Sequence, residues 1–473
     1  MSDADGGYSS AASMPPRKAR SKPGRGGGCD QRSRLLDAIV AVVGRDGYGR
    51  AKIGEIAARA GVSRATFYDF FQDKQACFNA AHQHLSLRAG EQIEEEISRA
   101  NPARAAHAAV EAIAALAQRE PEALSFLTHE ALLAGAQARA QHDELLARLE
   151  RAVEQAWDRA PQDEAAPDVP ARVLLGGTVR LYCMQARRRD LPEAELLPAL
   201  LRWIDCYSTP GGPRQRRTLL LKDASCTTPI DSDIKRHTSP RTLPRGRHRL
   251  PKDVVEAIHR ERIAYATVEV LSEQDGPATA VSDIVAAAGV SREVFYAHFA
   301  DKQQAFLAAR QLVFEQLIAA CSSAFFTPGT SWPERVWNTG RAGAGLLAAN
   351  PSFAHFAFVS AYGTGELGVR CVDESALAFK VFLEEGHRQG ADAAGLPRIV
   401  SDALALGVAA IVAHHVRTGR TSELSALIPA VAYTALAPFI GCEEAGELVD
   451  RMREQERSST HGRPVGTAAR QTA

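Results

Sequence analysis

Two short runs of side chains that can contact DNA bases lie at equivalent places in a repeated block. The block is GVSRATFYDFFQDKQACF from Gly61 and GVSREVFYAHFADKQQAF from Gly289, with eleven of its eighteen positions identical. Arginine can bond guanine O6 and N7, glutamate can accept from cytosine N4, and small or methyl-bearing side chains can touch a thymine methyl. Residues of these types stand near the start of each copy: Arg64, Ala65 and Thr66 in the first, and Arg292, Glu293 and Val294 in the second. They could read base edges if the block forms a helix that enters the major groove.

The repeat continues upstream of the block and predicts a three-helix unit. Apolar residues spaced three, four and seven apart recur at an offset of 228 residues, which indicates amphipathic helices. We expect helices at roughly 33–46, 53–60 and 64–71, with counterparts 228 residues later. Gly61 and Gly289 mark the place where the chain is expected to leave the second helix. Such a turn needs a positive φ, which glycine adopts at little energetic cost. Ser63 and Ser291 are expected N-caps of the third helix. This order is typical of a helix-turn-helix, whose second element reads the major groove.

Each predicted head is followed by a long region of apolar helices punctuated by prolines. Pro121 and Gly135 recur as Pro351 and Gly365 at an offset of 230, so the duplication extends beyond the heads with a slip of two residues. Alternating β-branched runs are rare, and an all-α fold of two tandem units is predicted. The expected domains are a disordered basic arm (1–30), a first head (31–78), a first C-terminal helical domain (79–207), a basic proline-rich linker (208–252), a second head (253–306), a second C-terminal helical domain (307–453) and a disordered tail (454–473).

Charge and cysteine spacing restrict the function classes. The formal net charge is zero, which argues against a nucleic-acid binder, but basic residues are concentrated in 17–34 and in the linker 208–252. Both segments could lie along phosphate, and both could equally be solvated linkers. The eight cysteines are scattered without a CxxC pair, so free thiols in a reducing compartment are expected, with no metal and no cofactor. The longest apolar run, 403–413, is too short to span a bilayer, and a cytoplasmic, nucleoid-associated location is expected.

The strings AGVSRATFYDFFQDKQACF, from Ala60, and AGVSREVFYAHFADKQQAF, from Ala288, resemble the TetR/AcrR family of bacterial transcriptional regulators. The resemblance implies a DNA-binding head, a helical C-terminal domain that binds a small molecule, and operator binding by homodimers. Two units in one chain depart from the usual single unit. The resemblance also implies backbone or base contacts from Tyr68 and Tyr296, and phosphate contacts from Lys74, Lys302 and His298. Phe70 replaces that histidine in the first head, and Lys52 replaces the small hydroxyl residue that often precedes the second helix.

Other aromatic and histidine positions are weaker signals. Phe67, Phe71 and Phe78, with their counterparts, are spaced for the core. A set of aromatic and histidine side chains on apolar helices are candidates for a ligand pocket, although such residues are more often ordinary core. They are His129, Trp157, Tyr182, Trp203, Trp337, His355, Phe356, Tyr362, His414 and His415. The glycine-rich run Gly343–Gly345 lies in a helical pattern with no preceding strand, so it does not indicate a phosphate-binding loop, and an enzyme is not expected.

The sequence therefore predicts a sequence-specific DNA-binding regulator, a repressor released by a small-molecule effector. The alternative is a helical interaction protein in which one head has lost DNA binding and serves for dimerisation. The 45-residue linker 208–252 would reach about 35–40 Å as a flexible coil, close to the ~34–36 Å between successive half-sites. The two units could therefore pair within one chain as an intramolecular pseudo-dimer, reading two unlike half-sites. A homodimer of whole chains is equally allowed.

Overall fold

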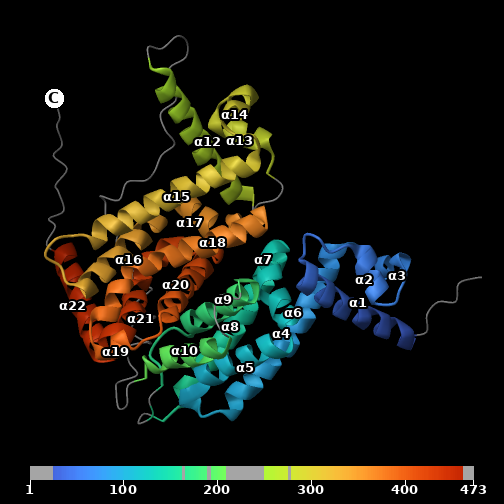
Figure 1. The fold of residues 1–473 in the computed structure, drawn as a ribbon, viewed down its shortest axis with the longest axis horizontal. Helices are drawn as coiled ribbons and strands as arrows, with labels where there is room; N and C mark the ends of the chain where they lie inside the picture. The colour runs from blue at the N-terminus through green and yellow to red at the C-terminus, as the bar shows by residue number, and fades with distance from the viewer. Residues whose placement is uncertain are drawn as a thin grey trace, which may run out of the picture.

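Every regular element in the described part of the chain is a helix, which confirms the all-α prediction. The computed structural model describes residues 25–161, 164, 166–188, 193–208, 250–274 and 279–461, and no strand occurs among them. Figure 1 shows two helical units, the first coloured blue to green and the second yellow to red. The C-terminal helices of the two units pack together as one core, from which the two heads project.

The first unit begins with a three-helix head and continues into its helical domain. The head consists of α1 (Arg25–Asp46), α2 (Ile53–Arg59) and α3 (Arg64–Phe70). The domain consists of α4 (Lys74–Arg99), η1 (Pro102–Arg104), α5 (Ala105–Arg119), α6 (Pro121–Ser125), the π-helical turn η2 (Phe126–Glu130), α7 (Ala131–Leu133), α8 (Ala136–Arg159), α9 (Ala171–Arg188) and α10 (Glu193–Asp205).

The second unit repeats this order with more irregular helical turns. Its head consists of α12 (Lys252–Gln274), α13 (Val281–Ala288) and α14 (Arg292–His298). Its domain consists of α15 (Lys302–Phe325), α16 (Trp332–Ala349), α17 (Pro351–Phe358), η4 (Ser360–Thr364), α18 (Glu366–Ala378), η5 (Phe379–Phe382), η6 (Glu384–Arg388), α19 (Ala391–Ala394), α20 (Ile399–Arg417), η7 (Thr421–Leu427), α21 (Ile428–Ile440) and α22 (Cys442–His461).

The ends of the head helices follow the local signals in the sequence. Ser63 Oγ accepts from the Thr66 amide at 3.0 Å, and Ser291 Oγ accepts from the Val294 amide at 3.2 Å, so both predicted N-caps are confirmed. Gly61 and Gly289 have φ of 65° and 60°, the left-handed values expected where the chain leaves the second helix. These capped turns end the second helix and begin the third at equivalent residues of the two heads.

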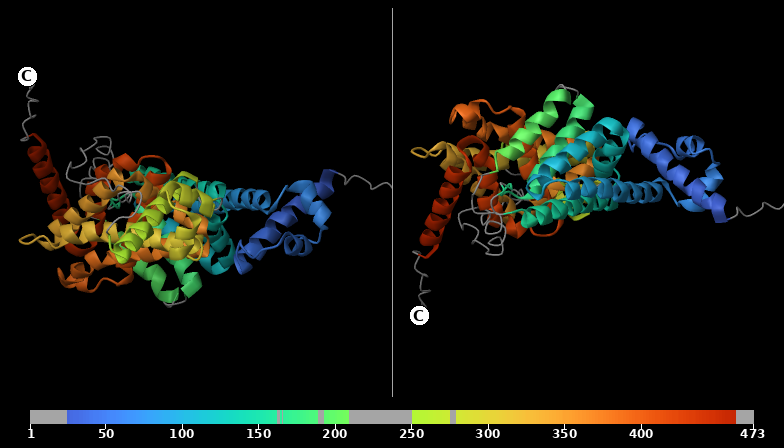
Figure 2. Two further views of the ribbon diagram at one scale, coloured as in Figure 1. Left: turned by 90° about the horizontal axis from the view of Figure 1, so that it is seen from above. Right: turned by 90° about the horizontal axis from the view of Figure 1, so that it is seen from below.

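Two predicted boundaries are corrected by the helices themselves. Helix α1 begins at Arg25, so residues 25–30 of the predicted disordered arm are helical, and α22 continues through residues 454–461 of the predicted tail. The remainder of both segments, and linker residues 209–249, lie outside the described residues. The two views of Figure 2 place the first head at one end of the molecule and α22 at the other.

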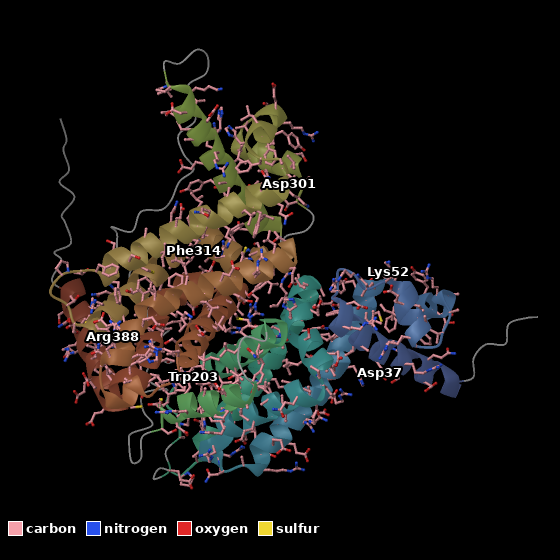
Figure 3. The ribbon with its side chains drawn as sticks, in the orientation of Figure 1. Asp37, Lys52, Trp203, Asp301, Phe314 and Arg388 are labelled. Carbon is pink, nitrogen blue, oxygen red and sulfur yellow. The ribbon has the colours of Figure 1, made fainter. Side chains whose placement is uncertain are left out.

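The two units meet through a close crossing of α9 and α20. A Cβ atom added at Gly407 would lie 2.4 Å from the Val173 carbonyl oxygen, and one at Gly177 would lie 2.5 Å from the Ala403 carbonyl oxygen. Such distances are far inside van der Waals contact, so the helices approach this closely only because these positions are glycine. Figure 3 shows Trp203, on the adjacent α10, pointing into this part of the core.

Polar bonds between the units surround this crossing. The Asp143 carboxylate of α8 accepts from His414 Nδ1 at 2.8 Å and from Arg417 at 2.5 Å on α20. Burial raises the pKa of the Asp143 carboxyl, but the His414 hydrogen bond and the Arg417 and Arg172 charges outweigh it and hold this pKa well below its usual range. The Tyr207 hydroxyl donates to the Thr434 carbonyl at 2.8 Å. The interface therefore combines a closely packed helix crossing with hydrogen bonds and ion pairs between the two units.

Two helical segments of the second unit are long and apolar enough to cross a membrane by length and composition. They are Ile399–Arg417 and Thr421–Ile440, with 61% and 72% of their apolar windows buried inside the protein. The apolar run at 403–413 thus belongs to a helix longer than the run itself. A helix that is apolar on all sides is typical of a protein core, and both segments pack among helices of the two units.

A pair of buried histidines holds the π-helical turn of the first unit. His82 Nε2 and His142 Nδ1 both donate to the Leu127 carbonyl, at 3.1 and 3.0 Å. Burial lowers the pKa of His142 to about 3, and the nearby His82 and Arg417 add to this effect. The His142 ring is therefore neutral in the folded protein at neutral pH, and burial also lowers the pKa of His82.

We expect this arrangement to make the protein less stable in mild acid. An unfolded histidine titrates near pH 6.5. Below that pH the unfolded chain takes up a proton that folded His142 does not accept, so stability is lost progressively from about pH 6.5 down to pH 3. Between pH 7 and pH 5 His142 alone should cost about 2 kcal/mol in urea unfolding. His142→Gln should reduce this loss, whereas Gln at the exposed His84 should leave it unchanged.

Candidate nucleic-acid interface and ligand cavity

The two recognition helices present similar surfaces to solvent. At the start of α3, Arg64 and Ala65 are exposed and Thr66 is half-buried; at the start of α14, Arg292 and Glu293 are exposed and Val294 is half-buried. Tyr68 and Tyr296 are 56% and 57% exposed, although each ring edge rests on a buried phenylalanine, Phe67 or Phe295. In Figure 1 the first head projects to the right and the second to the top, so both border the upper right side of the molecule.

The two reading arginines differ in their surroundings. A Cβ atom at Gly54 would lie 2.3 Å from Arg64 Nη2, so the Arg64 guanidinium rests against the start of α2 in the space left by this glycine. The equivalent position in the second head, at the offset of 228, is Ser282. Thr66 Oγ1 also lies 3.0 Å from Ser63 Oγ, which ties this hydroxyl to the N-cap. The sequence repeat shows that Gly54 is replaced by Ser282 in the second head. Only the structure shows that Gly54 leaves room for the Arg64 guanidinium.

The two anchoring lysines are not equivalent. Lys74 Nζ donates to the carbonyls of Tyr48 and Ala51 at 2.6 and 3.1 Å and lies 4.2 Å from the centre of the Tyr48 ring. Burial lowers its pKa. Lys302 is exposed, and its Nζ donates to the Thr279 carbonyl, the counterpart of Ala51 at the offset of 228, over a long 3.4 Å. The counterpart of Tyr48, residue 276, lies outside the described residues. Lys74 therefore ties α4 to the turn after α1, and a phosphate contact of either lysine stays a prediction.

Substitution of the two lysines should separate these roles. Lys74→Ala leaves two carbonyls without their charged donor and should lower the free energy of unfolding by about 2 kcal/mol. Lys302→Ala should leave stability unchanged and reduce the slope of log affinity against log salt by about one. The measurements are urea unfolding and salt titration of DNA binding. A Lys74→Ala variant with normal stability and a reduced salt slope would instead support the phosphate contact that the sequence predicts for Lys74.

The remaining head residues singled out by the sequence have mixed placements. His298 is half-buried and lies edge-on to His259 of α12, with ring centres 6.0 Å apart. Phe70, its counterpart, packs at the border of the first core. Lys52 is exposed at the start of α2, and Figure 3 shows it at the edge of the first head. None of these placements tests a contact with DNA.

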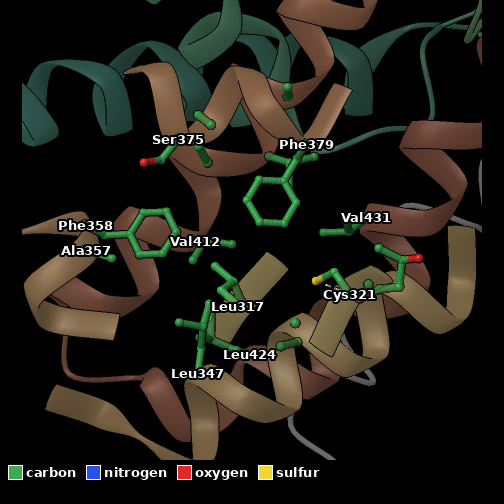
Figure 4. A pocket seen from close by; sticks show the side chains of 18 of the residues that line it. Leu317, Cys321, Leu347, Ala357, Phe358, Ser375, Phe379, Val412, Leu424 and Val431 are labelled. Carbon is green, nitrogen blue, oxygen red and sulfur yellow. Dashed lines mark hydrogen bonds between the residues drawn. The ribbon is translucent and has the colours of Figure 1, made fainter. Parts of the chain in front are cut away.

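A cavity of about 220 Å³ lies in the second unit (Figure 4). Its walls come from α15, α16, α17, α18, α20 and α21 with the turns beside them, and most are aliphatic or aromatic. Its few polar side chains are Arg310, Thr339 and Ser375. The Thr339 hydroxyl is already bonded to the Arg335 carbonyl at 2.8 Å, and Ser375 Oγ accepts from Arg310 at 3.3 Å. Arg310 Nε is buried without a hydrogen-bond partner among the described residues.

Of the aromatic and histidine candidates, Phe356 lines this cavity. The others are used for packing or for bonds between the units. Trp157, Trp203 and Trp337 are buried core, and Tyr182 is buried nearby. His129 and His414 pair with carboxylates of the other unit, His355 bonds Ser360, and His415 bonds a carbonyl of its own helix. Tyr362 lies at the contact between the units.

The cavity depends on glycines that the first unit lacks. Gly340 and Gly343 of α16 line it, and at the offset of 230 their counterparts in α5 are Val110 and Ile113, which are buried. A Cβ atom at Gly340 would meet Ile428 Cδ1 at an ordinary 3.7 Å, so room for a side chain exists there. This difference could be found in the sequence, because aligning Pro121 with Pro351 places the two glycines opposite Val110 and Ile113. Sequence reasoning missed it because it considered the glycine-rich run Gly343–Gly345 only as a phosphate-binding loop.

Two helix-turn-helix heads with exposed recognition helices on a helical body define the chain as a DNA-binding regulatory protein. Comparison with known proteins specifies the family. The profile of "Bacterial regulatory proteins, tetR family" matches residues 35–81 and 263–309, which cover most of each head and the start of α4 or α15. The chain belongs to the TetR family of bacterial regulatory proteins and carries two of its units in tandem.

The curated relatives match over a short stretch of the chain. The HTH-type transcriptional regulator BetI of Yersinia pestis (strain Pestoides F) is 32% identical over 68 residues, which is 14% of this chain and 34% of BetI. BetI of Yersinia pseudotuberculosis serotype O:1b (strain IP 31758) gives the same values. The chain thus spans about a third of the length of these curated relatives.

Solved structures with a similar fold cover part of the chain. A TetR family transcription regulator from Marinobacter aquaeolei VT8 is 21% identical, covers 37% of this chain and 95% of its own, and has a TM-score of 0.31. A TetR-like transcriptional regulator from Rhodococcus sp. RHA1 is 18% identical, covers 46% of this chain and 100% of its own, and has a TM-score of 0.29.

Proposed function

We propose that this protein is a cytoplasmic repressor whose two heads bind one operator as an intramolecular pseudo-dimer, and which an apolar effector releases. The observation that supports it most is the crossing of α9 and α20, which joins the two units of one chain. Packing this close orders the two heads relative to each other, as dimerisation does for separate subunits. A covalent link between the units also replaces subunit association by a high effective concentration.

The polar contacts support the pseudo-dimer by their near-symmetry. Asp143 and Asp373 correspond at the offset of 230, and each carboxylate binds an arginine of the other unit, Arg417 or Arg180. A contact that is repeated in both directions is characteristic of a two-fold interface. The recognition helices differ between the two units, because Glu293 and Val294 of the second head stand where the first head has Ala65 and Thr66. The operator is therefore expected to have two unlike half-sites.

The cavity lining supports an apolar, uncharged effector. The walls are apolar, and the free hydrogen-bond donor among the described lining groups is Arg310 Nε. Glu374 lies 3.6 Å from the same guanidinium and already balances its charge. An uncharged apolar molecule with one carbonyl or hydroxyl acceptor would satisfy this donor without adding a buried charge.

The test is DNA selected from a random pool by the full chain, followed by sedimentation of the complex. One chain on two unlike half-sites is the expected result. Two chains on a palindrome would indicate a homodimer with four heads, and a single half-site would indicate that one head serves only for association. Effector release is tested by surveying uncharged apolar compounds for ones that raise the melting temperature and lower DNA affinity. Such a compound should lose its effect on Gly340→Val and keep it on Ala342→Val, a matched change on the same helix outside the cavity.

A further inference from the structure

Helix α18 touches both the cavity of the second unit and the first unit. Cys371, Val372, Ser375 and Ala376 line the cavity. Val372 also packs against an apolar cluster formed by Leu132 of the first unit with Tyr362 and Val369 of the second. Helix α18 contacts α7 of the first unit, and Figure 1 shows one end of α18 close to α7. A shift of α18 would therefore change both the cavity of the second unit and the contacts with the first unit.

Two polar bonds join α18 to the first unit beside this cluster. Glu366, the first residue of α18, accepts from His129 Nε2 at 2.8 Å. Asp373, in the middle of the helix and buried, pairs with Arg180 of α9. A helix bound at several places cannot slide freely, because packed interiors change between discrete arrangements.

The first-unit side of these contacts is the segment that holds the first head. His129 belongs to the π-helical turn η2, and its neighbour Glu130 accepts from the Tyr48 amide at 2.6 Å in the turn between α1 and α2. Helix α1 packs closely on α6, where a Cβ atom at Gly44 would lie 2.6 Å from Glu122 Cβ. The position of η2 therefore determines where the first head sits.

We propose that the cavity of the second unit controls the first head in trans through α18, so that one effector per chain acts on both heads. This inference rests on the proposed effector role of the cavity. The second head is reached in cis, because Phe356 of α17 lines the cavity and shares an apolar cluster with Phe353 of the same helix and with Tyr265 of α12. An effector shifts the heads only if it prefers one arrangement of α17 and α18.

The test fills the cavity from within, so that no effector is needed. Gly340→Val and Gly340→Phe place increasing volume in the cavity, and Ala342→Val is the matched control. Hydrogen–deuterium exchange of the DNA-free chain is followed at residues 47–51 and 126–130 for the first head and at 263–271 for the second. Filling should change exchange rates about fivefold or more in both regions. The change should be larger for Phe than for Val and absent in the control.

A second set of variants tests the route. In the Gly340→Phe background, the Glu366→Ala, Val369→Ala pair should abolish most of the change at 47–51 and 126–130 and keep the change at 263–271. If the pair unfolds the chain, Glu366→Ala alone serves, with a partial loss expected. Changes confined to the second unit, or a first-head change that these substitutions leave intact, would overturn the trans connection. Exchange is measured without DNA or effector, so failure of operator binding or release would contradict the proposed function and leave this result readable.

Discussion

The Arg64→Ala, Arg292→Ala double variant is expected to lose roughly 30-fold to 10⁴-fold in operator affinity. Each bidentate arginine–guanine contact is worth about 1–3 kcal/mol of discrimination, and the two helices lie on separate heads, so the losses should add. Both side chains are exposed at the first turn of their recognition helices, where base edges are reached. Fluorescence anisotropy with a labelled operator measures the loss.

The single variants sharpen this expectation. Each should relax sequence preference at one half-site and leave the other half-site unchanged, because the heads are separate. Arg119→Ala, at an exposed position of α5 in the first helical domain, should bind as the parent does. Unchanged affinity in the double variant would show that these arginines do not read the operator. Loss at only one half-site would identify the head that has kept DNA binding.

Removing Arg180 is expected to be the most destabilising single change at the contact between the units. Arg180→Met leaves the buried Asp373 carboxylate without its partner, which typically costs about 3–5 kcal/mol. The Arg180 side chain is 12% exposed and lines a small pocket with Tyr362 and Asp373. Urea unfolding should show a lower midpoint, and sedimentation should show whether the units separate.

A matched double variant distinguishes the pair from general packing. Arg180→Met with Asp373→Leu removes both charges and should recover most of the loss, because a buried ion pair can be replaced by apolar residues of similar size. The coupling energy from this cycle is expected to exceed about 2 kcal/mol. Additive losses would mean that the charges do not interact in solution and that the interface depends on the α9–α20 crossing alone.

The heads were predictable because their signals are local. A serine N-cap, a glycine with positive φ and an apolar repeat of three and four each act within one or two helical turns, and Ser63, Gly61 and their counterparts behave as expected. Because the pattern repeats at an offset of 228, each prediction for the first head also applied to the second. The all-α class followed from the same periodicity, which does not depend on how helices pack.

The tertiary structure alone decided the roles that depend on distant partners. Lys74 appears in the sequence as a helix-start lysine, but the carbonyls of Tyr48 and Ala51, more than twenty residues away, turn it into a structural tie. The cavity arises where Gly340 faces Ile428, and the joining of the units arises where Gly407 meets Val173. Contacts of this kind depend on shape complementarity between helices far apart in the chain. The apolar periodicity of one helix predicts which of its faces is buried, but not which helix packs against that face.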